Sequence, residues 1–125
     1  MNLKYKSNSI MVTTTHNPYI MKYRFQKLYY AIIIKDCKRY SSILNKQRMD
    51  VVMTDNDLNI LKITREMHEN TVCEHLKATT TILLPLNYFK DLEVGEKFIL
   101  EEPKEGVKRT WLKKEVKENL KKISK

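Results

Sequence analysis

Two histidines and two cysteines are the residues of this chain whose chemistry could support a metal site or a nucleophile. His68, Cys73 and His75 lie close together in the sequence, and Cys37 carries the second thiol. Thiolates and imidazoles are ligands that zinc prefers. If residues 71–78 are helical, however, Cys73 and His75 point away from each other, because residues two apart do not share a helix face. We therefore expect neither a zinc site nor a cysteine–histidine nucleophile pair.

Other catalytic signatures are missing from the sequence. It contains no glycine-rich phosphate loop, no HExxH motif and no carboxylate pair at a suggestive spacing. Glu66 and Glu69 fit the solvated face of a helix. We therefore predict a protein that is not an enzyme and that carries no cofactor and no metal.

Size and composition predict one globular domain. The chain has 125 residues, of which 42% are apolar and 31% charged, enough for a core without disulfides or metals. Two cysteines are too few for a disulfide framework, which indicates a reducing, cytoplasmic setting. The longest apolar run, Leu28 to Ile34, has seven residues and is too short to span a bilayer, so we expect no membrane association. Only two glycines are present, few for the hairpins of a barrel, which favours helices.

Basic residues are concentrated in two parts of the chain. The formal net charge is +9, and residues 20–53 and 104–125 each carry +6. An excess of this kind suggests a polyanionic partner, although a solvated lysine surface is the simpler account.

The first half of the chain predicts an arm followed by a long helix. Residues 1–17 lack periodicity and are expected to form a loose N-terminal arm, and residues 18–125 a single domain. Asn17 can cap a helix, and Pro18 fits its first turn. Apolar residues then recur at steps of three and four, which predicts a helix over residues 18–46. The β-branched and aromatic run YYAIII within it is also typical of a buried strand.

Residues 54–92 carry the signals of a helix-turn-helix. Thr54 and the two aspartates after it suit a helix N-terminus and predict a helix over about 55–68. Asn70 or Thr71 can cap a second, short helix, and this order of elements is typical of a helix-turn-helix. Pro85 would cost about 3 kcal/mol inside a helix, so a third helix has to begin near it.

A strand interpretation of the same segment remains open. In it, DND forms a hairpin tip, LNILKIT the returning strand, and TTTILL a buried strand, since three consecutive threonines suit a helix interior poorly.

The last part of the chain predicts a wing and a closing helix. Two strand-like runs on either side of the turn EPKEG predict a hairpin over residues 96–112. Leu112, Val116, Leu120 and Ile123 fall on one stripe, which predicts an amphipathic helix over residues 111–124.

Taken in order, these elements resemble the MarR-type winged helix-turn-helix regulators of bacteria and archaeal viruses. The resemblance covers about residues 54–125. The matching positions are Thr54, Ile60, Leu61, Thr71, Glu74, Leu76, Leu92 and the hairpin Lys97 to Leu112. The implied fold is mainly α with a small β-hairpin, and an α+β small barrel is the alternative.

The resemblance implies a homodimeric transcriptional regulator that binds duplex DNA, with two helices in successive major grooves and the wings on the backbone. The implied candidates for contacts at or near base edges are Thr79, Thr80, Thr81, Asn87, Tyr88 and Lys90. The implied wing contacts are Lys104, Lys108 and Arg109.

The alternative hypothesis is a non-catalytic accessory or inhibitory protein, of the kind that phages and viruses encode. It would bind a protein or a single-stranded RNA through a small β-rich core. The segment TTTILLP and the segment DLEVGEKFIL motivate it, because residues 91–96 fit a turn that leads into a barrel strand.

Overall fold

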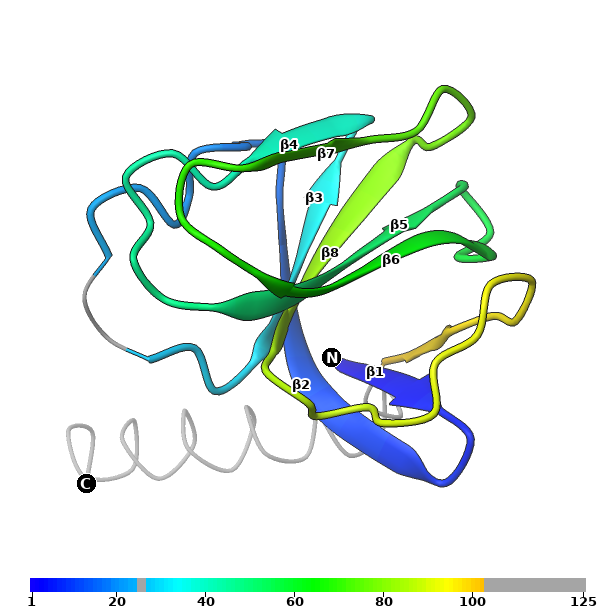
Figure 1. Ribbon diagram of the computed structural model, residues 1–125. Coiled ribbons are helices and arrows are strands. Elements are labelled where there is room, and N and C mark those ends of the chain that lie inside the picture. The colour runs from blue at the N-terminus through cyan, green and yellow to red at the C-terminus, as the bar shows by residue number, and fades with distance from the viewer. Residues whose placement is uncertain (25–26, 103–125) are drawn as a thin grey trace, which may run out of the picture.

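The computed structural model describes residues 1–24 and 27–102, and these form nine β-strands and no helix (Figure 1). The strands are β1 (Asn2–Tyr5), β2 (Asn8–Thr15), β3 (Ala31–Lys35), β4 (Arg39–Ser41), β5 (Met49–Thr54), β6 (Ile60–Met67), β7 (Val72–Glu74), β8 (Thr80–Pro85) and β9 (Ile99–Glu101). The prediction of a mainly α fold is wrong. The barrel of the alternative describes this part of the chain better. No helix long and apolar enough to cross a membrane occurs among these residues.

The predicted helices are replaced by strands. Residues 18–46 form turns followed by β3 and β4, and residues 54–92 contain β6, β7 and β8 in place of a helix-turn-helix. The stretch predicted as a loose arm, residues 1–17, contains β1 and β2. The predicted C-terminal helix, residues 111–124, and most of the predicted wing lie outside the described residues. Burial on both faces explains the error, since isoleucine and threonine runs suit a strand that is covered on two sides.

Seven of the strands form one curved sheet. Their order is β6-β5-β8-β3-β2-β1-β9, and β4 and β7 form a second, two-stranded sheet. Neighbours in the large sheet are antiparallel except β2 and β3, which run parallel with Val12 opposite Ala31 and Thr15 opposite Ile34. The eight-residue β2 serves two partners, because its first half pairs with β1 and its second half with β3.

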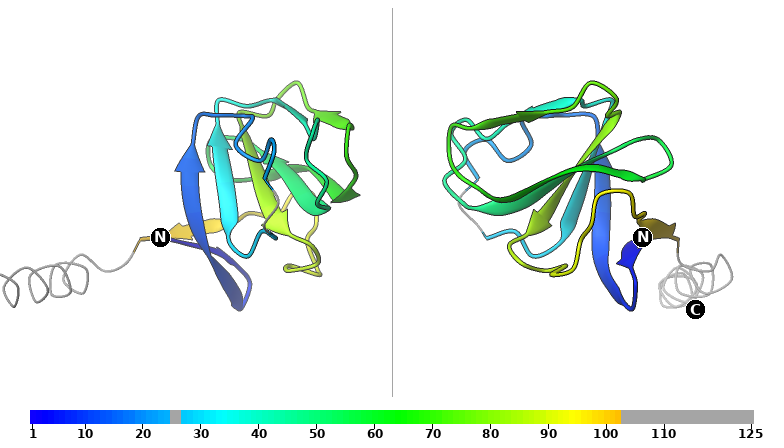
Figure 2. Two further views of the ribbon diagram at one scale, coloured as in Figure 1. Left: turned by 90° about the vertical axis from the view of Figure 1, so that its left-hand side faces the viewer. Right: turned by 45° about the vertical axis from the view of Figure 1, so that its right-hand side comes forward.

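The chain before β9 brings the two ends of this sheet together. Asn59 forms a β-bridge with Lys97. The amide of Ile60 donates to the carbonyl oxygen of Glu96 at 2.7 Å, and the amide of Phe98 donates to that of Leu58 at 3.1 Å. Residues 95–98 therefore contact the start of β6, and β9 then pairs with β1 (Figure 2). The sheet closes into a small barrel at this end.

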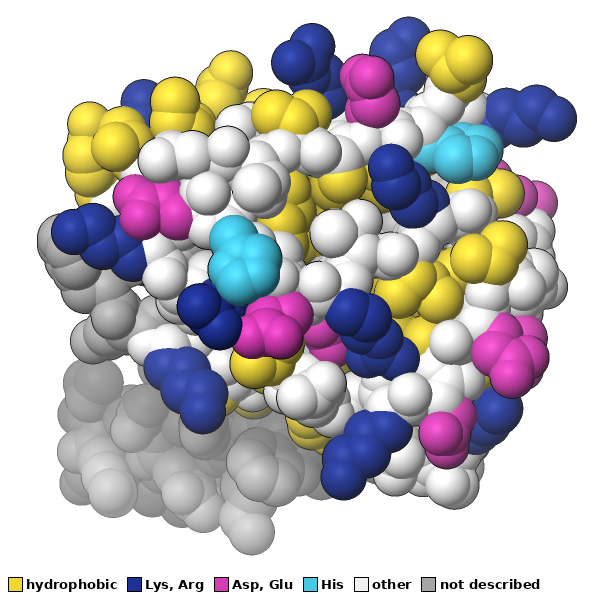
Figure 3. All heavy atoms as spheres, viewed as in Figure 1, with side chains coloured by type: hydrophobic (Ala, Val, Ile, Leu, Met, Phe, Trp, Pro, Cys, Tyr) yellow, Lys and Arg dark blue, Asp and Glu magenta, His cyan; other side chains and the backbone are white. Residues whose placement is uncertain are grey.

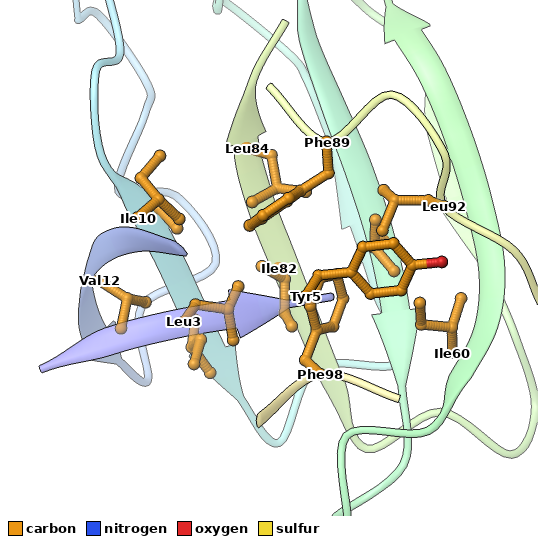
Figure 4. Close-up of a cluster of buried hydrophobic side chains, with 13 residues drawn as sticks. Leu3, Tyr5, Ile10, Val12, Ile60, Ile82, Leu84, Phe89, Leu92 and Phe98 are labelled. Carbon is orange, nitrogen blue, oxygen red and sulfur yellow. The ribbon is translucent and has the colours of Figure 1, made fainter. Parts of the chain in front are cut away.

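Both faces of the central strands are buried. Along β3, β5 and β8, alternate side chains point to opposite faces, as the geometry of a strand requires. The first core comprises Leu3, Tyr5, Ile10, Val12, Ala31, Ile33, Val52, Ile60, Ile82, Leu84, Phe89, Leu92 and Phe98 (Figure 4). The second core comprises Met21, Leu28, Ile32, Ile34, Cys37, Tyr40, Met49, Val51, Met53, Met67, Cys73, Ala78 and Leu83. β1 and residues 89–98 cover the first face, and residues 16–24 and 27–30 with β4 and β7 cover the second.

Three aromatic rings join the first core to the closing segment. The ring centroids of Tyr5, Phe89 and Phe98 lie 5.7–5.9 Å apart in edge and tilted arrangements, which favour aromatic packing. The Tyr5 hydroxyl lies 2.8 Å from the carbonyl oxygen of Asp91 and 2.5 Å from Oε1 of Glu96. A buried tyrosine thus fixes the loop that closes the barrel.

A buried carboxylate ties three segments together. Asp50, on β5, is 1% exposed. Its Oδ1 accepts the amide of Glu66 at 2.9 Å, and its Oδ2 accepts the amide of Asn87 at 2.8 Å and Nη1 of Arg65 at 2.9 Å. Arg65 also donates to the carbonyl oxygens of Phe89 and Lys90. The turn after β8 is thereby held against the β5–β6 pair.

Tight turns are made almost without glycine. Positive φ angles occur at Lys6 (55°), Asp36 (55°), Asn70 (59°) and Asn87 (59°), each directly after a strand or between two strands. Such a conformation costs an ordinary residue about 1–2 kcal/mol, and less for asparagine and aspartate, whose side chains bond locally. The low glycine content therefore does not exclude a barrel.

The predicted helix cap at Thr54 is a hairpin turn. The Asp55 carboxylate accepts the side-chain amide of Asn59 at 3.0 Å, the backbone amide of Asn59 at 2.9 Å and that of Asp57 at 3.0 Å. These hydrogen bonds, with the Asn59 side chain contributing most, lower the pKa of Asp55. The DND sequence is the tip between β5 and β6, as the strand interpretation had it.

We predict that Asp50→Asn lowers the free energy of unfolding by about 3 kcal/mol, because the amide nitrogen would replace one of the two accepting oxygens and would face at least one donor that the carboxylate satisfies. Urea denaturation would measure the loss. The control is Glu66→Gln, which alters an exposed ion pair with Arg48 and should cost less than about 1 kcal/mol. Equal effects of the two substitutions would contradict this role.

Asp55 should make stability dependent on pH in the acid range. Its pKa is lower in the folded chain than the ordinary 3.8, so its contribution is complete above that value and is lost as pH falls through the folded pKa. The difference in unfolding free energy between the wild type and Asp55→Ala should therefore shrink on acidification. A difference that stays constant to low pH, or that Asp57→Ala reproduces, would argue against this assignment.

Candidate nucleic-acid interface

The three threonines proposed as base contacts begin a buried strand. Thr80 and Thr81 lie on β8 and are 7% and 0% exposed. The Thr81 hydroxyl donates to the carbonyl oxygen of Cys37 at 2.9 Å, and the amide of Thr79 donates to that of Thr54 at 2.9 Å. Thr81 therefore has no access to a nucleic acid, and the threonines serve the sheet.

The other proposed contacts lie at the opposite end of β8. Asn87, Tyr88 and Lys90 are exposed in the turn after it. The amide of Asn87 is bound by Asp50, and the Tyr88 hydroxyl donates to the carbonyl oxygen of Ser9. Two groups separated by a six-residue strand do not form one contact surface. The proposed wing contacts Lys104, Lys108 and Arg109 lie outside the described residues.

The cysteines and histidines do not assemble into a metal centre. Within residues 1–24 and 27–102, no group of three or more His, Cys, Asp or Glu side chains could hold a metal ion. Cys37 and Cys73 are buried in the second core, and burial raises the pKa of the Cys73 thiol. His68 is exposed and His75 is half-buried.

A loop rich in tyrosine offers a different candidate. It connects the parallel strands β2 and β3 and spans residues 16–30. Tyr19, Tyr23 and Tyr29 on it are 59%, 64% and 74% exposed. Large aromatic side chains that remain this exposed are uncommon. Several of them in one loop indicate a candidate interaction surface.

Local hydrogen bonds shape the start of this loop. The Asn17 side-chain oxygen accepts the amide of Tyr19 at 2.9 Å, which makes an Asx turn where the sequence predicts a helix cap. The amide of Lys22 donates to the carbonyl oxygen of Tyr19, and that of Arg24 to the carbonyl oxygen of Met21. Tyr23 has a positive φ of 62°, which ends any helical continuation.

Two apolar anchors hold the loop against the sheet. Met21 is 1% exposed and Leu28 is 3% exposed, and both belong to the second core. The amide of Leu28 also donates to the side-chain oxygen of Gln47 at 2.8 Å. Tyr19, Tyr23 and Tyr29 point outward, whereas Tyr30 packs partly against the second core.

Cations lie among the exposed rings. The Nζ of Lys22 is 5.8 Å from the ring centroid of Tyr19 and 5.6 Å from that of Tyr23, and the Arg24 guanidinium carbon is 5.8 Å from that of Tyr30. These distances are within the range of cation–π contact. The rings of Tyr29 and Tyr30 are 5.2 Å apart at 77°.

Few acidic residues lie close enough in the sequence to balance the positive charge of this region. Asp36 is the sole acidic residue between positions 17 and 48, and it lies near His16 at the end of β3. Among the described residues, Lys22, Arg24, Lys27 and Lys46 form no ion pair, whereas Arg48 pairs with Glu66 at 2.7 Å. We name the tyrosine–basic surface as Tyr19, Lys22, Tyr23, Arg24, Lys27, Tyr29 and Tyr30. Figure 3 shows yellow side chains with dark-blue ones beside them at the upper left, a region where Figure 1 draws this loop together with the connection from β4 to β5.

The sequence contained a signal for this surface. Between positions 19 and 30, aromatic and basic residues alternate closely, a composition typical of surfaces that bind single-stranded nucleic acid. The helical periodicity of the same residues concealed it, because Tyr29 then belongs to a buried stripe.

Comparison with known proteins identifies the fold and no family. No family model and no curated protein matches the chain. A proposed transcription regulator from Sinorhizobium meliloti has a similar structure, with a TM-score of 0.66, 12% identity, and 78% of this chain and 89% of that chain covered. A protein of unknown function from Novosphingobium aromaticivorans matches with a TM-score of 0.62 and 10% identity, covering 79% of this chain and 82% of that chain.

These findings overturn the winged-helix resemblance. A MarR-type regulator requires a helix-turn-helix, and the described residues contain strands at the positions of both helices. The residues that carried the resemblance have other roles. Ile60 belongs to the first core, whereas Leu76 is 94% exposed.

Nitration by tetranitromethane should separate the surface tyrosines from the buried ones, because the reagent attacks phenolates that it can reach. Burial raises the pKa of Tyr5 and of Tyr40 to about 12, which disfavours their phenolates. We expect Tyr19, Tyr23 and Tyr29 to react first, as mass spectrometry of peptides would show. Early nitration of Tyr40 would contradict the described packing.

Proposed function

We propose that this chain is a non-catalytic protein that binds single-stranded nucleic acid, RNA in the first instance, on the tyrosine–basic surface. The observation that carries the proposal is the combination of three tyrosines more than half exposed with neighbouring cations that have no acidic partner among the described residues. Bases of a single strand can stack on the rings while the cations contact phosphates.

The geometry suits a single strand better than a duplex. Stacking needs unpaired bases with free faces, and in a duplex these faces are already stacked on each other. Sequence reading in a major groove needs a protruding helix or a two-stranded ribbon. The tyrosine–basic surface offers neither, because its residues lie on an irregular loop anchored by Met21 and Leu28.

The loop anchors make the surface partly preorganised. Met21 and Leu28 fix the backbone next to the rings, and contacts of Lys22 and Arg24 with tyrosine faces restrict those side chains. A ligand therefore meets rings that need little further ordering, which reduces the entropic cost of binding.

A protein partner is the second candidate, and a neighbouring apolar patch favours it. Ile43, Leu44 and Val72 are 45%, 38% and 48% exposed. Leu44 adjoins the loop, since its carbonyl oxygen accepts the amide of Tyr23 at 3.3 Å. The two candidates differ in their need for phosphate, because binding to a single strand weakens steeply with salt.

Fluorescence anisotropy with labelled RNA of about twelve nucleotides would test the proposal. We expect Tyr29→Ala to weaken binding about tenfold, since loss of stacking costs about 1–3 kcal/mol per base. Tyr88→Ala is the matched control, because Tyr88 is also exposed but lies outside the surface. Duplex DNA of equal length should compete poorly, and DNA single strands would show whether the 2′-hydroxyl matters.

Charge substitutions supply the second arm of the test. Lys22→Ala and Lys27→Ala should each weaken binding to all sequences and reduce the salt dependence, whereas Lys77→Ala, an exposed lysine on another loop, should change little. Absence of RNA binding at low salt, or equal affinity in Tyr29→Ala and Tyr88→Ala, would refute the proposal. Binding that persists in high salt with a protein partner would favour the second candidate.

A further inference from the structure

A cleft lies on the opposite face of the sheet from the tyrosine–basic surface. Its volume is about 370 Å³, within the usual size range of small-molecule sites. The lining residues are Thr14, Ile33, Lys35, Asp36, Asn56, Leu58, Thr80 and Leu100. Ile33 and Leu58 connect it with the first core, whereas the anchors of the tyrosine loop belong to the second core.

The strand register explains why a cleft forms at this end of the barrel. Ile33 lies opposite Ile82, and Lys35, two residues further along the same face, lies opposite Thr80. The apolar core therefore ends at the isoleucines, and the next row of the same face is polar. On β2, Thr14 pairs with Ile33 and places a hydroxyl beside the isoleucine row.

Leu100 confirms that the cleft is open to solvent. It lies opposite Leu3, which is 0% exposed, so both side chains are on the inner face of the sheet. Leu100 is nevertheless 38% exposed. An inward-facing leucine that contacts water is an apolar surface that a ligand can cover favourably.

The polar groups around this apolar floor are not engaged within the described part of the chain. Lys35 forms no ion pair there, and the side chains of Thr14 and Asn56 form no hydrogen bond with a described residue. The one acidic lining residue, Asp36, lies 3.4 Å from the imidazole of His16. Within residues 1–24 and 27–102, Lys35 is thus an unpaired cation at the edge of an apolar cleft.

We infer that this cleft binds a small amphipathic anion. The apolar body of the ligand packs against Ile33, Leu58 and Leu100, and its carboxylate, sulfonate or phosphate group is held by the ammonium of Lys35. The Thr14 hydroxyl and the Asn56 amide orient the ligand by hydrogen bonds. The site is separate from the tyrosine–basic surface and does not depend on the function proposed for it.

The aromatic sulfonate 8-anilinonaphthalene-1-sulfonate is a suitable probe, because it combines an apolar body with one negative charge. We expect fluorescence titration and calorimetry of the full chain to give one site. Lys35→Gln should weaken binding about tenfold, and Lys35→Arg should retain most of it, because a charge-assisted contact is lost in the first and kept in the second. Lys38→Gln, which changes an exposed lysine outside the cleft, is the control.

Amide chemical shifts would locate the probe. Shifts concentrated at residues 14, 33, 35, 56, 58 and 100 would support the site, and shifts concentrated on the tyrosine loop would refute it. Equal affinity of Lys35→Gln and the wild type would also overturn the inference. RNA affinity should be unchanged in Lys35→Gln, so failure here is distinguishable from failure of the proposed RNA binding.

Discussion

The barrel depends on a carboxylate that is buried and fully bonded. Removing Asp50 from water is costly, and the cost is offset because its oxygens accept two backbone amides and a guanidinium. The arrangement also specifies geometry, since those donors come from β6 and from the turn after β8. Arg65 extends it to the carbonyl oxygens of Phe89 and Lys90. Phe89 is thereby held in the first core against Tyr5 and Phe98. This contact positions residues 89–98, the segment that closes the barrel.

Burial of both faces of the sheet determines where binding surfaces can arise. The three central strands have apolar side chains on each side, so each face needs its own cover. The loop between β2 and β3 covers one face with two anchors and leaves its tyrosines outside. Residues 89–98, β1 and β9 cover the other face incompletely, and the cleft remains at the polar end of the strands. Both candidate sites therefore result from the way in which the sheet is covered.

Local sequence patterns predicted parts of this fold and misled about others. TTTILL and the DND turn indicated a strand and a hairpin tip, and both are present in β8 and between β5 and β6. YYAIII indicated a buried strand as well as a helix. Periodicity alone could not distinguish the two, because a strand that is buried on both faces lacks the alternation of polar and apolar residues. The non-glycine residues with positive φ concealed the turns.

Long-range features were beyond prediction from the sequence. Nothing near Asp50 in the sequence indicates that its partners are at positions 65, 66 and 87, and the cleft depends on register between four strands. Of the site residues proposed from the sequence and described by the structure, Thr80 lines the cleft. Thr81 is buried and Thr79 is half-buried directly before β8, whereas Asn87, Tyr88 and Lys90 lie at the far end of the strand. The tyrosine–basic surface could be identified only once the structure showed that its residues do not form a helix.

The parallel pairing of β2 with β3 has an evolutionary consequence. Antiparallel neighbours can be joined by two residues, but parallel neighbours need a crossover long enough to return along the whole strand. Fifteen residues make that return here, and their packing requirement is met chiefly by Met21 and Leu28. The exposed positions Tyr19, Tyr23 and Tyr29 can diversify without loss of the scaffold. Related barrels could therefore acquire new ligands by exchanging this single connection, and an engineer could graft a recognition peptide at the same place.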